Sequence, residues 1–264
     1  MRPALSLAVL ALALPAAAQA LSCGNDASGF EAWKQEFAQV AGANGVGERG
    51  LAALAGASYA TRTIDADRNQ HSFRYPLDEF MRIRGADTIV SQGRRMLADN
   101  RDFYTSLENA YGVPAGVLIA IHGMETGFGN FMGDSNVVSA ITTLAYDCRR
   151  PEFFTPHALA ALALVDRGWV SPESIGARHG ELGHTQFLPG NILQYGQDGN
   201  ADGRVDLTDV ADAMASTANF FRQKGWQPGL GFQEGEPNYP VLQQWNAATV
   251  YQQAIALMAA RIEG

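Results

Sequence analysis

The stretch YGVPAGVLIAIHGMETGFG (residues 111–129) decides the fold prediction, because it is strongly apolar and carries a single acid, Glu125. Pro114 suits the first turn of a helix. Val117, Ile121 and Glu125 then fall at i, i+4 and i+8, which is one stripe of an α-helix. The spacing predicts a helix that carries the Glu125 carboxyl on the same stripe as its core-facing residues.

Two effects disfavour the charged form of Glu125 in such a helix. The apolar face desolvates the carboxylate, and the negative end of the helix dipole lies close by if the helix ends near Gly127 and Gly129. Both effects raise the pKa, and a carboxyl that stays protonated near neutral pH can protonate a glycosidic oxygen. A structural glutamate that caps or salt-bridges the glycine turn explains the spacing equally well, so the spacing alone leaves both readings open.

The remaining sequence predicts a mainly α fold. Strand-like alternation is scarce, and glycine and proline gather in Gly225 to Pro240, which we expect to be a loop or a small irregular lobe. Apolar residues recur with helical spacing in five further segments: Phe30, Trp33, Phe37 and Val40; Ile89, Met96 and Leu97; Leu159 to Val165; Val210 to Phe221; and Val250 to Ile262.

Length and composition predict one folded domain. With 264 residues, 47% of them hydrophobic, the chain can bury a sizeable core. Lys and Arg number 19 and Asp and Glu 27, so removal of a leader that contains Arg2 leaves a formal charge of 18 − 27 = −9. This charge excludes nucleic acid as an expected partner.

Residues 1–20, MRPALSLAVLALALPAAAQA, resemble a signal peptide that is cleaved before Leu21, which leaves residues 21–264 as the mature domain. A membrane-spanning helix is the first alternative, but the apolar run is shorter than the roughly 20 residues that cross a bilayer. A lipoprotein attached to the outer membrane through Cys23 is the second, although Ala20 is small where a lipid-attachment site has a large aliphatic residue. We expect an exported, periplasmic protein with no transmembrane anchor in its mature form.

Two cysteines, Cys23 and Cys148, remain in the mature chain. An exported protein meets an oxidising compartment, so we expect a disulfide that ties the N-terminal segment to the body of the fold. Two buried free thiols are the alternative.

Several sequence blocks together resemble one family, the B-type lytic murein transglycosylases. The resemblance runs from roughly Phe30 to the end of the chain, and its blocks keep the order found in the family. They are HGMETGFGNFMG (122–133), TLAYDCRR (143–150), GHTQFLPGN (183–191), STANFFRQKGW (216–226) and WNAATVYQQAI (245–255).

This resemblance implies a lysozyme-like helical domain of the goose-type or SLT-like kind with a glycan-binding cleft. Glu125 is then the single general acid/base, which protonates the bond between N-acetylmuramic acid and N-acetylglucosamine in peptidoglycan strands. As a carboxylate it next helps the muramic C6 hydroxyl to attack its own anomeric carbon. The product is a 1,6-anhydromuramic end, and this chemistry needs no cofactor and no second catalytic acid, whereas most glycosidases use two.

The resemblance also implies substrate-binding residues. Gln186 corresponds to the family's glutamine, whose neutral amide can hydrogen-bond sugar groups. Tyr251 and Asn246 belong to the closing block, together with Trp245, for which core packing is the alternative. Arg149 and Arg150 match a pair of arginines that would meet peptide carboxylates, although a solvated basic pair explains them equally well.

Other features depart from the family or take no part in the predicted chemistry. The segment 226–245 is far shorter than the β-rich lobe usual there, Phe220 replaces a tyrosine, and Glu181 and His184 stand where small or aromatic residues are usual. We assign no catalytic role to four acids, which we expect to be solvated or salt-bridged on the surface: Asp134, Asp147, Glu152 and Glu181.

The segment DGNADGRVDLTD (198–209) fits the EF-hand loop pattern, with Gly203 at the sharp turn. It predicts a structural calcium or similar cation, while an Asx-rich surface turn is the alternative. Asp209 replaces the usual glutamate at position 12. The predicted ligands are Asp198, Asn200, Asp202, the backbone carbonyl of Arg204, Asp206 and Asp209.

Three functions follow from these observations: a lytic transglycosylase, a water-using muramidase on the same scaffold, and a non-catalytic, calcium-dependent peptidoglycan-binding protein. Peptidoglycan is the expected partner of all three, and we expect a monomer.

Overall fold

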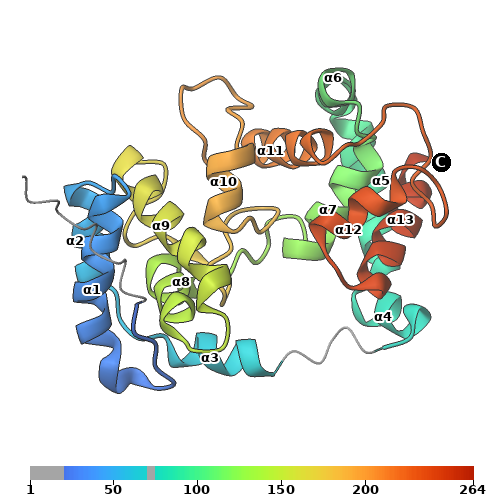
Figure 1. Cartoon of the computed structure of the whole chain (residues 1–264). Helices are drawn as coiled ribbons and strands as arrows, with labels where there is room; N and C mark the ends of the chain where they lie inside the picture. The colour runs from blue at the N-terminus through green and yellow to red at the C-terminus, as the bar shows by residue number, and fades with distance from the viewer. Residues whose placement is uncertain (1–20, 70–74) are drawn as a thin grey trace, which may run out of the picture.

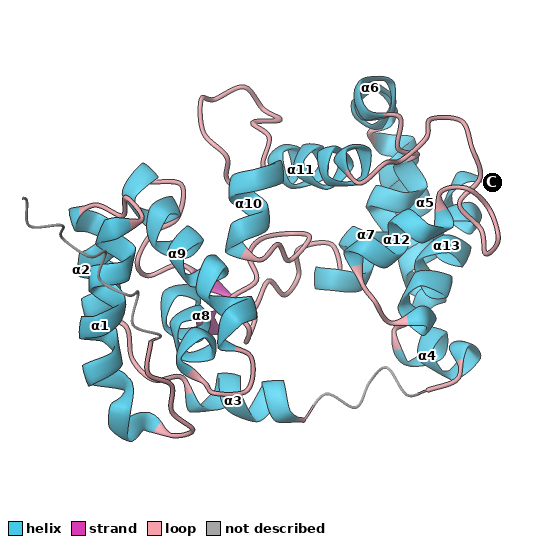
Figure 2. Ribbon diagram, in the orientation of Figure 1, coloured by secondary structure: helices cyan, strands magenta, loops and turns pink. Residues whose placement is uncertain are grey.

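A computed structural model describes residues 21–69 and 75–264, and the predicted signal peptide lies outside these described residues. Helices account for most of the described chain, as the sequence predicts (Figure 2). Within the described residues, no helix is both long and apolar enough to cross a membrane.

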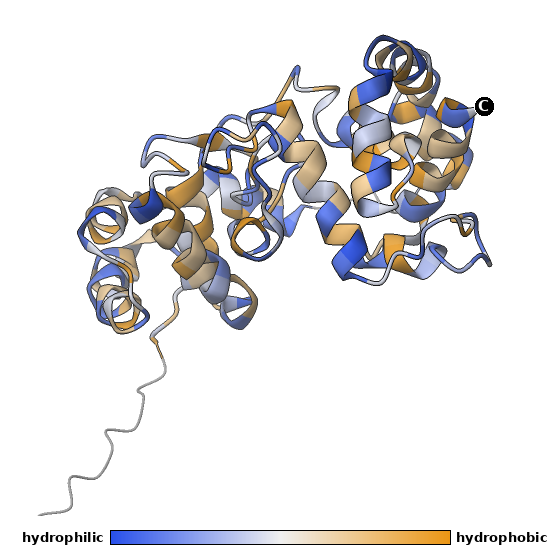
Figure 3. Ribbon diagram, turned by 90° about the horizontal axis from the view of Figure 1, so that it is seen from above, coloured by the Kyte–Doolittle hydropathy of each residue, from blue (hydrophilic) through white to orange (hydrophobic). Residues whose placement is uncertain are grey.

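The helices form two groups that stand apart in Figure 1. They remain apart in the view from above, with apolar positions spread through the helices of each group (Figure 3). The first group contains α1 (Phe30–Ala43), α2 (Glu48–Gly56), α3 (Thr61–Arg68), α8 (Val137–Tyr146) and α9 (Pro151–Arg167). The second contains α4 (Leu77–Ile83), α5 (Ala86–Asp99), α6 (Arg101–Tyr111), α7 (Ala115–Thr126), α12 (Tyr239–Trp245) and α13 (Thr249–Glu263).

Two helices join the groups. α10 (Pro189–Tyr195) packs on α9, and α11 (Val210–Gln223) packs on α10, α6 and α7. The described residues also contain a short 3-10 helix, η1 (Ala27–Gly29), and an antiparallel pair of two-residue strands, β1 (Ser135–Asn136) and β2 (Ile175–Gly176). The strand pair lies beside the first residues of α8, so it anchors the loop that leads away from α7.

Helix α7 is the centre of the second group, and it is buried more completely than a single apolar stripe predicts. Residues 115–124 are all buried, because α5 and α13 cover the helix from different sides. Two glycines permit this close packing. A Cβ on Gly116 would lie 2.5 Å from the carbonyl oxygen of Ala259 in α13, and one on Gly123 would lie 2.5 Å from the Cγ2 atom of Ile89 in α5.

Helix α7 ends where the sequence predicts. Gly127 caps it in the left-handed conformation, with φ of 57°, a backbone region that favours glycine. Glu125 therefore lies in the last turn, near the negative end of the helix dipole. The Thr126 hydroxyl fixes this end by donating to the carbonyl oxygen of His184, at 2.8 Å.

The expected disulfide is present. Cys23 and Cys148 are bonded, and Gly24 lies in a parallel bridge with Asp147, so the N-terminal segment is tied to the end of α8. The glycine-rich segment forms a loop between α11 and α12, as expected, although α12 already begins at Tyr239. The buried Asn238 side chain holds this loop by donating to the carbonyl oxygens of Gln227 and Leu230, at 2.9 and 2.8 Å.

Candidate active site

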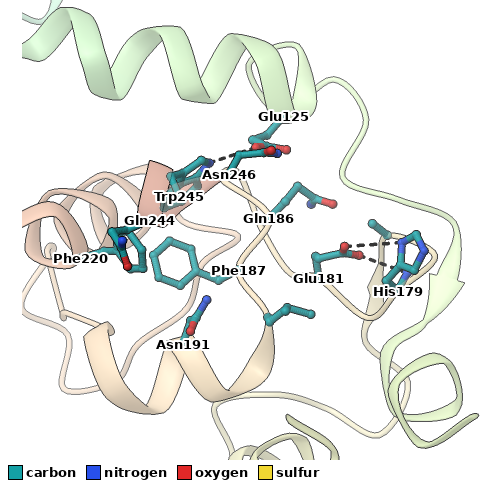
Figure 4. Close-up of a pocket in the computed structure, with 12 residues that line it drawn as sticks. Glu125, His179, Glu181, Gln186, Phe187, Asn191, Phe220, Gln244, Trp245 and Asn246 are labelled. Carbon is teal, nitrogen blue, oxygen red and sulfur yellow. Dashed lines mark hydrogen bonds and ion pairs between the residues drawn. The ribbon is translucent and has the colours of Figure 1, made fainter. Parts of the chain in front are cut away.

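The Glu125 carboxyl faces a pocket of ≈ 320 Å³ between the two groups of helices (Figure 4). The pocket is built from the end of α7, the loop before α10, and residues of α10, α11 and α12. Its lining consists of Glu125, Ala177, His179, Glu181, Gln186, Phe187, Leu188, Asn191, Phe220, Gln244, Trp245 and Asn246. None of these twelve residues is a lysine or an arginine.

Two donors hold one oxygen of Glu125. The Tyr251 hydroxyl from α13 and the indole Nε1–H of Trp245, at 3.2 Å, both donate to Oε1. No ion pair to Glu125 is found among the described residues, which argues against the salt-bridging alternative. The carboxyl is thus fixed in position while its other oxygen remains free for chemistry.

Burial raises the pKa of Glu125 above its usual value. The hydrogen bonds from Tyr251 and Trp245 oppose this rise because they stabilise the charged form, the charge of Glu181 adds to it, and Arg84 opposes it. Burial is the largest of these effects, so the net shift of the Glu125 pKa is upward, which is the direction that the sequence predicts.

Tyr251, which the resemblance implies as a substrate contact, lies beside Glu125 and outside the pocket lining. Its side chain is buried, 4% exposed, and is absent from the pocket lining. Its hydroxyl donates to Glu125 from α13. Burial and the Glu125 charge raise the pKa of its phenol well above the ordinary value, so it stays a donor. Tyr251 therefore positions the acid.

The residues around Tyr251 in the sequence do reach the pocket. Trp245 lines it and also packs against Phe187, Phe220 and Phe221, as the core-packing alternative predicts. Asn246 lines the pocket as expected, and its side-chain oxygen accepts from the Ala248 backbone N–H at 2.9 Å. The aromatic cluster fixes the indole that donates to Glu125.

Gln186 lies in the pocket, as the resemblance implies. Its backbone has a φ of 55°, unusual for a residue other than glycine. Its side-chain nitrogen donates to the carbonyl oxygens of Gly183, at 2.7 Å, and Met132, at 3.3 Å. The side-chain oxygen remains the acceptor that a sugar group would meet.

Arg149 and Arg150 do not line the Glu125 pocket, and neither is a free basic side chain. Both are paired with the buried carboxylate of Asp67, which is 3% exposed, and they hold its pKa below the ordinary value against the opposing effect of its own burial. The sequence could not predict this pairing because Asp67 lies far from the arginines along the chain. Their role in this structure is to neutralise a buried acid.

Three of the four acids without an assigned role lie outside the pocket, but Asp147 is buried, 2% exposed, which corrects our expectation of a surface residue. Asp134 pairs with Arg62 and Asp147 with Arg68, while Glu152 is exposed at the start of α9. Glu181 lines the pocket together with Glu125. It lies in the loop before α10, where its side chain is 25% exposed and lies 3.6 Å from the ring Nδ1 of His179.

The loop 198–209 matches the predicted cation site only in part. The side-chain oxygens of Asp198, Asn200 and Asp202 accept backbone N–H groups of the loop itself. The Asp206 carboxylate pairs with the Arg204 guanidinium at 3.1 Å. The Arg204 side chain thus forms an ion pair within the loop, while the predicted cation ligand was its backbone carbonyl. Among the described residues, no group of three or more His, Cys, Asp and Glu side chains is arranged to hold a metal ion.

Asp209 is not the acid that closes this loop. It caps α11, where its side chain accepts from the backbone N–H groups of Ala211 and Asp212. The fully buried Asp212 closes the loop instead, because its carboxylate accepts from the N–H groups of Gly199, Asn200 and Asp206. The EF-hand spacing predicts the ligand at position 12, which is Asp209, and the acid that holds the loop backbone lies three residues further along the chain.

Sequence reasoning missed several lining residues, including His179, Asn191 and Gln244. Asn191 ends the block 183–191 that also contains Gln186, and the only signal for His179 and Gln244 was their proximity to the Gln186 and Trp245 blocks. It also missed a buried pair behind the site, in which His122 Nε2 and His184 Nδ1 lie 2.9 Å apart. His184 Nε2 lies 3.1 Å from the Thr208 carbonyl oxygen, so this histidine links α7 to the 198–209 loop.

Residues 29–235 match the transglycosylase SLT domain family. Membrane-bound lytic murein transglycosylase B of Escherichia coli (strain K12) is 35% identical over 121 residues, which are 45% of this chain and 34% of that protein. The matched part of the chain thus spans about a third of the length of this relative.

Solved structures agree over most of the chain. The crystal structure of SltB3 from Pseudomonas aeruginosa in complex with NAG-anhNAM-pentapeptide superposes with a TM-score of 0.82 at 28% identity, covering 89% of this chain and 80% of that one. The Escherichia coli lytic transglycosylase Slt35 in complex with calcium superposes with a TM-score of 0.76 at 21% identity, covering 92% and 96%. The second likeness concerns the fold.

Proposed function

Because the chain belongs to the transglycosylase SLT domain family, we propose that it is a peptidoglycan lytic transglycosylase with Glu125 as its single general acid/base. It cleaves the β-1,4 bond between N-acetylmuramic acid and N-acetylglucosamine and leaves 1,6-anhydromuramic ends. The observation that carries the proposal is the Glu125 carboxyl, which faces the pocket with a raised pKa and two fixed donors on one oxygen.

In the first step, the protonated Glu125 gives its proton to the glycosidic oxygen. The bond between that oxygen and the muramic anomeric carbon breaks, and the N-acetylglucosamine fragment leaves with a free 4-hydroxyl. Glu125 becomes an anion at this point. Tyr251 and Trp245 already point their donors at Oε1, so they stabilise the charge as it develops.

In the second step, the Glu125 carboxylate accepts the proton of the muramic C6 hydroxyl. The C6 oxygen attacks the anomeric carbon and closes the 1,6-anhydro ring, which restores the protonated acid. The nucleophile is the C6 hydroxyl of the sugar itself, so neither water nor a cofactor takes part in the proposed reaction. A second carboxylate is not needed for this cycle, unlike in most glycosidases.

We propose that Gln186 and Asn246 bind the glycan by hydrogen bonds and that the exposed part of Trp245 packs on a sugar ring. The SltB3 complexes with NAG-anhNAM-pentapeptide and NAG-NAM-pentapeptide support a peptidoglycan fragment as the ligand. We further propose that the protein is exported to the periplasm, where peptidoglycan lies. The membrane-bound name of the Escherichia coli relative keeps attachment through a lipid as the alternative.

A muramidase activity is the second candidate, because Glu181 places another carboxylate in the same pocket. Such an enzyme would use a carboxylate to activate water, and its products would carry hydrated reducing ends.

The test is digestion of purified peptidoglycan followed by mass spectrometry of the products. Anhydro ends are expected from the wild type. The Glu125→Gln variant keeps an acceptor for Tyr251 and Trp245 and should fold, yet it has no proton to deliver, so its cleavage rate should fall by at least about 10²- to 10⁴-fold. Hydrated ends would identify a muramidase. An inactive wild type that sediments with peptidoglycan would indicate a binding protein.

A calcium-type cation at the 198–209 loop is a separate proposal. The oxygen-rich spacing supports it, as does the calcium complex of Slt35, while the side chains as they stand fit a cation only in part. The cation has no step in the chemistry above. Its role would be to fix the loop that leads into α11.

A further inference from the structure

Glu181 is held in place at the side of the pocket opposite α7 (Figure 4). Its side chain is 25% exposed. One carboxyl oxygen accepts from the His179 backbone N–H at 3.1 Å, and the other lies 3.6 Å from the His179 ring Nδ1. Glu181 is therefore a fixed group and not a mobile surface side chain.

His179 is anchored in turn to the first group of helices. Its ring Nε2 lies 3.8 Å from Asp67, the buried acid at the end of α3 that Arg149 and Arg150 neutralise. The ring thus stands between two carboxylates. This arrangement connects Glu181 through His179 to the ion pairs of Asp67 with Arg149 and Arg150, which limits the freedom of its carboxylate to turn away from the pocket.

The two pocket acids share a space whose lining contains no lysine or arginine. The groups that act on Glu125 come from four elements: Tyr251 on α13, Trp245 on α12, Arg84 at the end of α4, and Glu181 on the loop before α10. His179 also lines the pocket on the Glu181 side. Of these groups, Glu181 is the only one whose charge disfavours ionisation of Glu125, because like charges in a partly enclosed pocket repel.

We propose that Glu181 is a positioning residue that keeps the catalytic acid protonated between turnovers and so sets the upper pH limit of cleavage. This inference rests on the proposed function of Glu125. Glu181 neither donates nor accepts a proton in the cycle. It acts through its charge, which His179 and the Asp67 cluster hold at a fixed place.

The first test is the pH profile of kcat/KM for peptidoglycan cleavage by the wild type, Glu181→Gln and Glu181→Asp. The alkaline limb reports loss of the acid's proton. It should move to lower pH by roughly half a unit or more in Glu181→Gln, the size expected from one like charge in a hydrated pocket. The readout is the position of this limb relative to the activity plateau on its acidic side, measured separately for each variant. Glu181→Asp keeps the charge and should keep the wild-type limb.

Asp99→Asn is the matched control, because it also removes one negative charge, at an exposed position at the end of α5. Its limb should not move. An unmoved limb in Glu181→Gln would overturn the proposal. Equal loss of activity at every pH, or a switch in the proportion of anhydro to hydrated ends, would also overturn it by assigning Glu181 to substrate contact or to chemistry.

A second measurement does not depend on turnover. Titration of the Glu125 carboxyl carbon by NMR should give a lower midpoint in Glu181→Gln than in the wild type, with the Tm of both proteins recorded to confirm folding. If the midpoint is lower in Glu181→Gln but the wild type does not cleave peptidoglycan, the proposed enzymatic function is refuted, while the effect of the Glu181 charge on Glu125 is supported. An equal midpoint in an active enzyme would refute the coupling alone.

Discussion

The Tyr251→Phe substitution removes one of the two hydrogen bonds that Glu125 Oε1 accepts and leaves the carboxyl otherwise in place. The ring of Tyr251 is buried and phenylalanine has the same shape, so packing against α7 should be preserved. The hydroxyl matters most when Glu125 is an anion, because hydrogen bonds to charged groups are stronger than those to neutral ones. The variant therefore tests how the enzyme stabilises the charge that forms after the first proton transfer.

The size of the effect follows from the bond that is lost. A hydrogen bond to a charged group contributes about 1.5–3 kcal/mol. If it is gained only as Glu125 ionises, its loss lowers kcat by roughly 10- to 150-fold. KM should change little, because Tyr251 does not line the pocket. The pKa of Glu125 should rise further, so the alkaline limb of the pH profile should move up, opposite to its movement in Glu181→Gln.

The assay is release of soluble anhydro-muropeptides from peptidoglycan across a pH series, with kcat and KM separated. Tyr239→Phe is the matched control: its hydroxyl is buried too, and it has no hydrogen-bond partner within the described part of the chain. That control should leave kcat and the pH limb unchanged. A Tyr251→Phe enzyme with normal kcat, or one in which only KM rises, would contradict the reasoning and return Tyr251 to the substrate-binding role that the resemblance implies.

Two further predictions concern stability. Burial and the neighbouring His184 lower the pKa of His122 from 6.5 to about 3, so His122 is neutral in the fold while the unfolded chain takes up a proton. The free energy of unfolding therefore decreases as pH falls from 6.5 toward about 3. In urea unfolding experiments, the free energy of unfolding of His122→Gln should depend less on pH in that window than that of the wild type. The same pH dependence in both proteins would contradict this prediction. For the 198–209 loop, saturating calcium should raise the Tm of the wild type, by a stabilisation of about 2.7 kcal/mol at roughly a hundredfold Kd, and should leave Asp198→Ala unmoved. Equal Tm values for the wild type in calcium and in chelator would refute a cation site in this loop.

The sequence by itself determined the local features of this protein. Helical periodicity located α1, α5, α7, α9, α11 and α13, and the glycines after Thr126 marked the end of α7, because these signals depend on residues within a turn or two of one another. The same local reasoning put Glu125 in an apolar setting near a helix terminus. It left its role open, since a capping glutamate has the same spacing.

The tertiary structure decided which distant side chains meet. It placed the Tyr251 hydroxyl against Glu125, paired Arg149 and Arg150 with the buried Asp67, and brought Glu181 into the pocket. Each of these pairings joins residues on different helices or loops, and no pattern along the chain encodes it. The physical reason is that burial and charge act across a few ångströms of space, whatever the separation in sequence.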